Sequence, residues 1–142
     1  MGNAKTLKVK ALLENVPVAI DFVTQSAKAS GLDDQSLYQV RVAVDEVCAN
    51  IVYHAYKGME PGEMEISCDL DDQAFVVRVR DWGNAFDPDT VVDPDLNAPL
   101  EDRALGGLGL FLVRQFMDQV RFTFDPELGN ELVMTKRLQV AG

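Results

Sequence analysis

Two stretches in the N-terminal third of the chain repeat apolar residues every three or four positions, which is the spacing of one face of an α-helix. Residues 16–30 form the first stretch. Pro17 lies near its start, where the first helical turn accepts proline, and a glycine follows its end. The second stretch starts after Asp33 or Asp34, either of which suits a helix cap, and extends to about Tyr56. The pattern therefore predicts two consecutive helices.

Alternation of apolar and polar residues, the period of a half-buried strand, dominates elsewhere. Five stretches are predicted as strands on this basis: Leu7–Leu13, Glu63–Leu70, Ala74–Arg80, Val120–Phe124 and Glu131–Leu138. The turn Asp71-Asp72-Gln73 joins two of them into a β-hairpin, and a third helix is expected from Gly106 to about Asp118. The order predicts a two-layer α/β sandwich, in which a mixed, mostly antiparallel sheet carries the helices on one face.

Residues 81–105 interrupt this periodicity. They include Pro88, Pro94 and Pro99 and five aspartates after Asp81. A connection of this length inside a compact domain is usually functional or disordered. We therefore expect a loop of one of these two kinds between the hairpin and the third helix.

Length and charge narrow the class of protein. A chain of 142 residues suits one domain with a substantial core, so residues 1–142 are expected to form a single domain. The net charge of -10 argues against direct binding of nucleic acid, which needs clustered Lys and Arg. Nucleotide binding stays open, because Mg²⁺ and backbone N–H groups also offset the charge of phosphates.

Composition also bears on the compartment. No apolar run approaches the roughly 20 residues that span a bilayer, and the N-terminus lacks the apolar segment of a secretory signal. Cys48 falls within the second predicted helix, and Cys68 lies on the apolar face of a predicted strand. Two buried free thiols suit a reducing compartment, so we expect a cytoplasmic protein without a membrane partner.

The sequence DEVCANIVYHAY, residues 45–56, places two polar residues beside the apolar face of the second helix. Glu46 and Asn50 are four positions apart and therefore lie one turn apart, at the edge of that face. They are either ordinary surface residues or a pair that faces a cleft beside the core. The single histidine, His54, is expected to be structural, and its spacing from the cysteines does not suit a zinc site.

The sequence FVVRVRDWGNAFDP, residues 75–88, ends a strand with a carboxylate. A period of two puts Asp81 on the apolar side, where an unpartnered charge is costly. Gly83 permits a sharp turn and the close approach of a flat ligand. The carboxylate either accepts a hydrogen bond from such a ligand, for example from the amino group of adenine, or closes its own turn on backbone N–H groups.

The sequence LGGLGLFLVRQFMD, residues 105–118, opens an apolar helix with three glycines in four residues. Free N–H groups and the helix dipole at such a start favour an anion; the alternative is a tight helix entry packed against a neighbour. No GK[ST] follows, so this is not a Walker A loop, and no βαβ unit surrounds it.

In this order, DEVCANIVYHAY, DWGNAFDP and GGLGLFLVRQFMD resemble the N box and the first and second glycine boxes of the histidine-kinase-like ATPases, the GHKL or Bergerat fold. Within that fold the chain resembles the bacterial anti-sigma-factor serine/threonine-protein kinases over nearly its whole length. The resemblance implies ATP and Mg²⁺ as cofactors. It implies that Asn50 helps to hold Mg²⁺ on the triphosphate and that Glu46 is the general base for a substrate serine. It also implies that Asp81 binds the adenine amino group and that Gly83 packs near the adenine ring.

The resemblance also makes residues 84–105 an ATP lid, in which Arg103 either offsets phosphate charge or is simply solvated. Thr135 on the last strand either lies near adenine or is an ordinary strand residue. Trp82, a bulky residue beside the adenine-reading aspartate, is expected to point away from it. The phosphates would contact the glycines that open the third helix: Gly106, Gly107 and Gly109.

The function implied by the resemblance is an ATP-dependent protein serine/threonine kinase that is also an anti-sigma factor. Such a protein phosphorylates an anti-sigma-factor antagonist, sequesters a sigma factor and commonly forms a homodimer through its sheet. One alternative is an ATP-binding interaction module without kinase activity. Another is the detached catalytic domain of a sensor histidine kinase, which is disfavoured because the only histidine, His54, lies within the N box.

Overall fold

A computed structural model of the chain describes residues 5–85 and 107–138. Arg103 and Gly106 thus lie outside the described residues. The predicted lid, residues 84–105, also lies outside them except for its first two residues. The strands are β1 (Lys5–Lys10), β2 (Glu63–Asp71), β3 (Ala74–Asp81), β4 (Gln119–Asp125) and β5 (Gly129–Arg137). The helices are α1 (Val16–Ala29), α2 (Asp34–Asn50) and α3 (Gly107–Phe116), with a 3-10 turn η1 (Leu13–Asn15) and a π-helical turn η2 (Ile51–Ala55).

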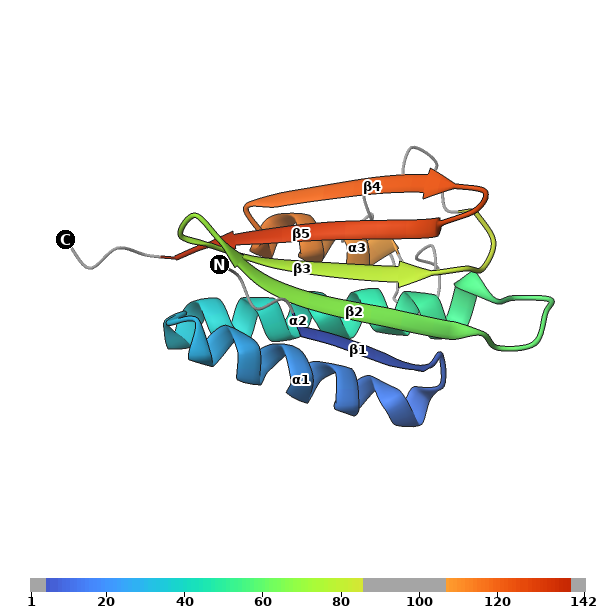
Figure 1. Cartoon of the computed structure of the whole chain (residues 1–142), viewed down its shortest axis with the longest axis horizontal. Helices are drawn as coiled ribbons and strands as arrows, with labels where there is room; N and C mark the ends of the chain where they lie inside the picture. The colour runs from blue at the N-terminus through green and yellow to red at the C-terminus, as the bar shows by residue number, and fades with distance from the viewer. Residues whose placement is uncertain (1–4, 86–106, 139–142) are drawn as a thin grey trace.

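The five strands form one sheet in the order β1-β2-β3-β5-β4. The helices cover one face of the sheet (Figure 1), so the predicted two-layer α/β sandwich is confirmed. Each neighbouring pair of these strands is antiparallel. Among the described residues no helix is both long enough and apolar enough to cross a bilayer.

The core lies between the sheet and α1 and α2. Residues of β3 that alternate along the strand, Phe75, Val77 and Val79, are almost completely buried. Val40 and Val44 of α2 are buried in the same cluster. Each such side chain contributes about 1.5–3 kcal/mol relative to an exposed position. This apolar layer fixes the register of the strands, because a shift of one residue would turn every inward side chain outward.

The first strand is shorter than the alternation predicts. Strand β1 ends at Lys10, which pairs with the first residue of β2, Glu63. Beyond it Ala11 turns into the core, and the Asn15 side-chain amide donates to the Lys10 carbonyl oxygen at 2.9 Å. The apolar residues at the end of the predicted strand therefore belong to the connection to α1.

The predicted helix boundaries are confirmed at α1 and at the start of α2. Gly31 has a φ of +97°, a conformation that suits glycine at a helix end. Asp33 is the N-cap of α2, and its Oδ1 atom accepts a hydrogen bond from the Ser36 N–H at 2.7 Å. At the other end, regular α-helix stops at Asn50 and a π-helical turn follows. Such turns are often found at functional sites.

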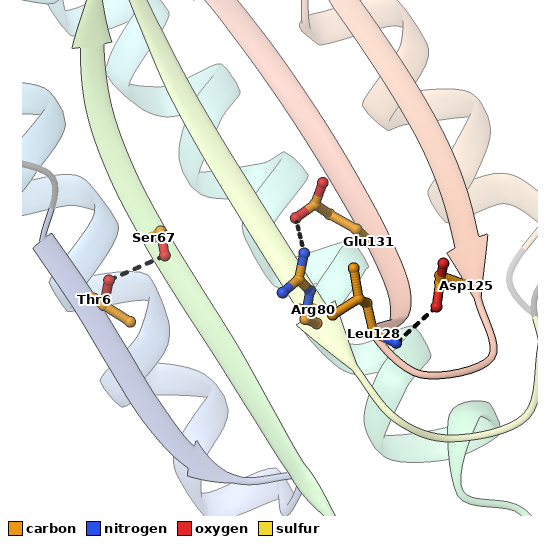
Figure 2. Close-up of polar contacts among 6 residues, drawn as sticks. All are labelled: Thr6, Ser67, Arg80, Asp125, Leu128 and Glu131. Carbon is orange, nitrogen blue, oxygen red and sulfur yellow. Dashed lines mark hydrogen bonds and ion pairs between the residues drawn. The ribbon is translucent and has the colours of Figure 1, made fainter.

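The face of the sheet opposite the helices carries polar cross-strand pairs, two of which Figure 2 shows. Cross-strand pairs on this face include Thr6 with Ser67, whose hydroxyl oxygens are 3.1 Å apart. They also include Arg80 with Glu131, an ion pair with an Nη2–Oε2 distance of 2.5 Å. Because inward residues alternate with these, the same register sends Asp81 to the helix-covered side.

Candidate functional site

Asp81 ends β3 on the inner face of the sheet and is only 6% exposed. Its Oδ1 atom accepts two hydrogen bonds, from the Gly83 N–H at 2.9 Å and from the Asn130 side-chain amide at 2.9 Å. Burial raises the pKa of Asp81, and these two hydrogen bonds only partly offset the effect. The carboxylate thus closes its own turn, as one alternative predicted, and both bonds end on the same oxygen.

Asn130 is a site residue that the sequence analysis missed. It pairs with Asp81 across the β3–β5 ladder, and its side-chain amide also donates to the Asn84 carbonyl oxygen at 2.8 Å. Gly129 before it has a φ of +83°, and a Cβ atom there would lie 2.3 Å from the Asp81 carbonyl oxygen. The strand register, which no local sequence pattern gives, brings this Gly-Asn pair to Asp81.

Gly83 is required by the protein's own backbone. A Cβ atom at Gly83 would lie 2.2 Å from the carbonyl oxygen of Ala55, in the π-helical turn. That same oxygen accepts a hydrogen bond from the Asn84 N–H at 2.6 Å. The end of the helix therefore fills the space on the Cβ side of Gly83, and the close approach of a flat ligand to this residue stays a prediction.

Glu46 and Asn50 lie one regular turn apart on α2, and both are half-buried. Burial raises the pKa of Glu46, with a smaller contribution from the charge of Asp45. Counting back from Ala55 at 1.5 Å per residue, Asn50 is about 7 Å and Glu46 about 13 Å along the helix. The contact at Gly83 thus places the Asp81 turn, Asn50 and Glu46 in succession along one helix.

Helix α3 runs antiparallel to α2 (Figure 1). The ring of Phe116 at its end lies 6.3 Å from the ring of Tyr38 near the start of α2. Gly107 is nine residues before Phe116, and Val47 is nine residues after Tyr38, so Gly107 lies approximately level with Val47. The first turn of α3, which also contains Gly109, therefore faces the part of α2 that carries the polar pair.

The other end of α3 is capped by a lysine. The Lys136 ammonium, on a largely buried residue, donates to the Phe116 carbonyl oxygen at 2.6 Å. A cation at this end complements the negative end of the helix dipole. The positive end of the dipole lies at the start of the helix, at Gly107. The predicted anion-favouring helix start is therefore compatible with the structure.

Thr135 does not join the other predicted residues. It pairs with Val76 and Gln119, so it lies five residues along the ladder from Asp81 and Asn130, roughly 17 Å away at strand spacing. An odd number of residues also places its side chain on the opposite face of the sheet. We therefore leave Thr135 out of the site; it is an ordinary strand residue, the second alternative.

Within residues 5–85 and 107–138, no group of three or more His, Cys, Asp or Glu side chains is placed to hold a metal ion. Asn50 supplies one amide oxygen beside the Glu46 carboxylate. Mg²⁺ on a nucleotide is generally held by one or two protein oxygens together with the phosphates. The donor set on α2 therefore fits Mg²⁺ that arrives with a triphosphate.

This arrangement defines a nucleotide-binding domain of the kind that the three motifs indicated. Comparison with protein families matches residues 9–136 to the histidine kinase-like ATPase domain. The chain belongs to the histidine kinase-like ATPase family, and the predicted family resemblance is confirmed.

Three curated relatives with the same name are similar to the chain over most of its length. Serine-protein kinase RsbW of Listeria monocytogenes is 34% identical over 140 residues, covering 96% of this chain and 88% of the relative. Serine-protein kinase RsbW of Halalkalibacterium halodurans is 36% identical over 137 residues, covering 94% and 82%. Serine-protein kinase RsbW of Bacillus cereus is 32% identical over 137 residues, covering 94% and 84%. The similarity spans most of both chains in each case.

Proposed function

We propose that this protein is an ATP-dependent serine kinase that phosphorylates an anti-sigma-factor antagonist and, as an anti-sigma factor, sequesters a sigma factor. The proposal is carried by the arrangement of the site along one helix: the Asp81 turn, Asn50 and Glu46 follow one another along α2. The start of α3 lies approximately level with Asn50 and Glu46. The name shared by the three relatives described above supports serine kinase activity. The partners, a cytoplasmic location and a homodimer follow from the family resemblance.

Adenine recognition falls to Asp81. Both of its hydrogen bonds within the described residues hold Oδ1, and we assign Oδ2 to the adenine amino group. The bonds to Gly83 and Asn130 prevent rotation of the carboxylate, so the accepting oxygen is oriented before the nucleotide arrives. A fixed acceptor favours adenine, which presents a donor, over a base that presents an acceptor at the same place.

The triphosphate binds between the start of α3 and the end of α2. The N–H groups in the first turn of α3, including those of Gly107 and Gly109, supply donors and the positive end of the helix dipole. Asn50 would hold Mg²⁺ through its amide oxygen, and the ion when bound offsets charge on the β- and γ-phosphates. The predicted contacts from Arg103 and Gly106 lie outside the described residues and remain part of the proposal.

Glu46 is the proposed general base. It accepts the proton of the substrate serine hydroxyl while the serine oxygen bonds to the γ-phosphorus and the bond to the β–γ bridging oxygen breaks, releasing ADP. Partial burial raises the pKa of Glu46, which makes its carboxylate a stronger proton acceptor than an exposed one. One helical turn separates the base from the metal-binding amide, so both act on the same phosphoryl group.

The test replaces Glu46 with Gln, which keeps the shape of the side chain and removes the base. Phosphoryl transfer to its partner, an anti-sigma-factor antagonist, is expected to fall by about 100-fold or more, while calorimetry shows ATP binding unchanged. Glu14→Gln, the same change at an exposed glutamate before α1, is the matched control. If the unaltered protein binds ATP but never phosphorylates its partner, the protein is an ATP-binding interaction module and the kinase proposal fails.

A further inference from the structure

The backbone that follows Asp81 is held by the last residue of the π-helical turn, Ala55, and by the two residues after it. The Trp82 N–H donates to the Tyr56 hydroxyl oxygen at 2.9 Å. The Asn84 N–H donates to the Ala55 carbonyl oxygen at 2.6 Å, and the Asn84 side-chain amide donates to the Lys57 carbonyl oxygen at 3.1 Å. Only the first of these bonds depends on a side chain of the helix end, so Tyr56 is the position where substitution can loosen the turn selectively.

Tyr56 is itself fixed on two sides. Its hydroxyl donates to the Glu63 carbonyl oxygen, at the start of β2, at 2.6 Å. Its ring lies against Gly62, where an added Cβ atom would approach the ring and hydroxyl to 2.5–2.8 Å. The residue is 8% exposed. A buried hydroxyl that both donates and accepts a backbone hydrogen bond has one orientation, so Tyr56 connects the helix end, β2 and the Asp81 turn rigidly.

The hydrogen bond from the Trp82 N–H to the Tyr56 hydroxyl oxygen fixes the peptide that follows Asp81. Trp82 turns to the face opposite Asp81, as predicted, where the Lys8 ammonium lies 5.1 Å from its ring centroid. Its N–H donates to the Tyr56 hydroxyl oxygen. The peptide between Asp81 and Trp82 is thus held by Tyr56, while Asn130 holds the Asp81 carboxylate.

We propose that Tyr56 is a positioning residue for adenine: its hydroxyl, through the Trp82 N–H, sets the direction in which Asp81 presents its carboxylate. The inference rests on the proposed ATP site and adds to it a residue that contacts neither base nor phosphate. Loss of one neutral hydrogen bond is expected to weaken binding about threefold to tenfold. Only ligands that contain adenine should be affected, because the groups for phosphate lie on α2 and α3.

The experiment compares Tyr56→Phe with Tyr53→Phe, a matched change at an exposed tyrosine within the preceding π-helical turn. Calorimetry with Mg-ATP, ADP, adenosine and inorganic tripolyphosphate measures each affinity. Tyr56→Phe is expected to weaken the three adenine ligands about threefold to tenfold and to leave tripolyphosphate and kcat at saturating ATP unchanged, so that KM alone rises. Trp82, the single tryptophan, reports the turn by its fluorescence.

A second variant, Gly62→Ala, keeps the hydroxyl but pushes it aside, and its expected binding profile is the same. It serves if Tyr56→Phe does not fold. Adenine affinities equal to those of the unaltered protein in the folded variants overturn the assignment, as does an equal loss for tripolyphosphate, which indicates a general structural defect. Absence of Mg-ATP binding by the unaltered protein is a different result, because it overturns the proposed function itself.

Discussion

Replacing Asp81 with Asn separates adenine recognition from folding. In the structure Oδ1 accepts from Gly83 and Asn130. An asparagine amide can keep both bonds only with its oxygen in the Oδ1 position, because the flipped amide would place its NH₂ group against two donors. The substitution therefore preserves the internal hydrogen bonds and converts the proposed ligand-facing oxygen into a donor.

The effect on stability is expected to be small. Two charge-assisted hydrogen bonds become neutral ones, which costs roughly 1 kcal/mol each, but removal of a buried charge offsets that loss. The raised pKa of Asp81 shows that the second effect outweighs the first, since the folded protein disfavours the ionised carboxylate. At neutral pH the free energy of unfolding should therefore change by no more than about 1 kcal/mol.

The effect on binding is expected to be large. The adenine amino group would meet a donor in place of a charged acceptor, and hydrogen bonds to charged groups contribute about 1.5–3 kcal/mol. A loss of about 2–3 kcal/mol corresponds to a roughly 30-fold to 150-fold weaker affinity for ATP. Calorimetric titration with Mg-ATP measures this, and Asp71→Asn at an exposed carboxylate of β2 is the control.

The pH dependence supplies an independent check. Because the folded pKa of Asp81 lies above its ordinary value of 3.8, the folded protein binds its proton first as pH falls. Unaltered protein should thus gain stability relative to Asp81→Asn as pH falls through the folded pKa toward 3.8. Urea unfolding of both proteins across this range measures the difference. An opposite slope, or wild-type ATP affinity in Asp81→Asn, refutes the reasoning.

Two further predictions concern the fold. Gln73 has a φ of +67° in the two-residue β2–β3 turn, so Gln73→Gly should raise the free energy of unfolding by about 0.5–1 kcal/mol in urea titration, and a decrease would contradict this account of the turn. Burial raises the pKa of Cys48 to about 12 and that of Cys68 to about 11. Thiol reagents at pH 8 should therefore label neither cysteine until the protein unfolds; rapid labelling of the native protein would show that these thiols are accessible.

The periodicity of the sequence predicted the type and order of every described strand and α-helix, because burial on one face is a local property of each element. It did not predict the π-helical turn after Asn50, where residue spacing alone continues a regular helix. Nor did it find Tyr56, whose importance depends on contacts with β2 and the end of β3. Contacts between segments far apart in the chain leave no local pattern.

The error at Thr135 was of a different kind, because the information was present. Leu132 and Met134 alternate as buried residues of β5, so an odd-numbered position on that strand faces away from the core. The same parity brings Asn130 to the face of Asp81. Applying the alternation to the strand as a whole would have excluded Thr135 and placed Asn130 on the inner face, although its pairing with Asp81 depends on the register.

Three parts of the proposed site, the Asp81 turn, Asn50 and Glu46, are arranged along one helix. Gly83 is in contact with the Ala55 carbonyl group, and Asn50 and Glu46 follow at fixed spacing back along α2, at about 1.5 Å per residue. A nucleotide whose adenine is held at Asp81 is consequently placed by a rigid element relative to Asn50, the proposed metal ligand, and Glu46, the proposed general base. Rigid elements hold reacting groups more accurately than loops do, which explains why Gly83 packs on the helix end.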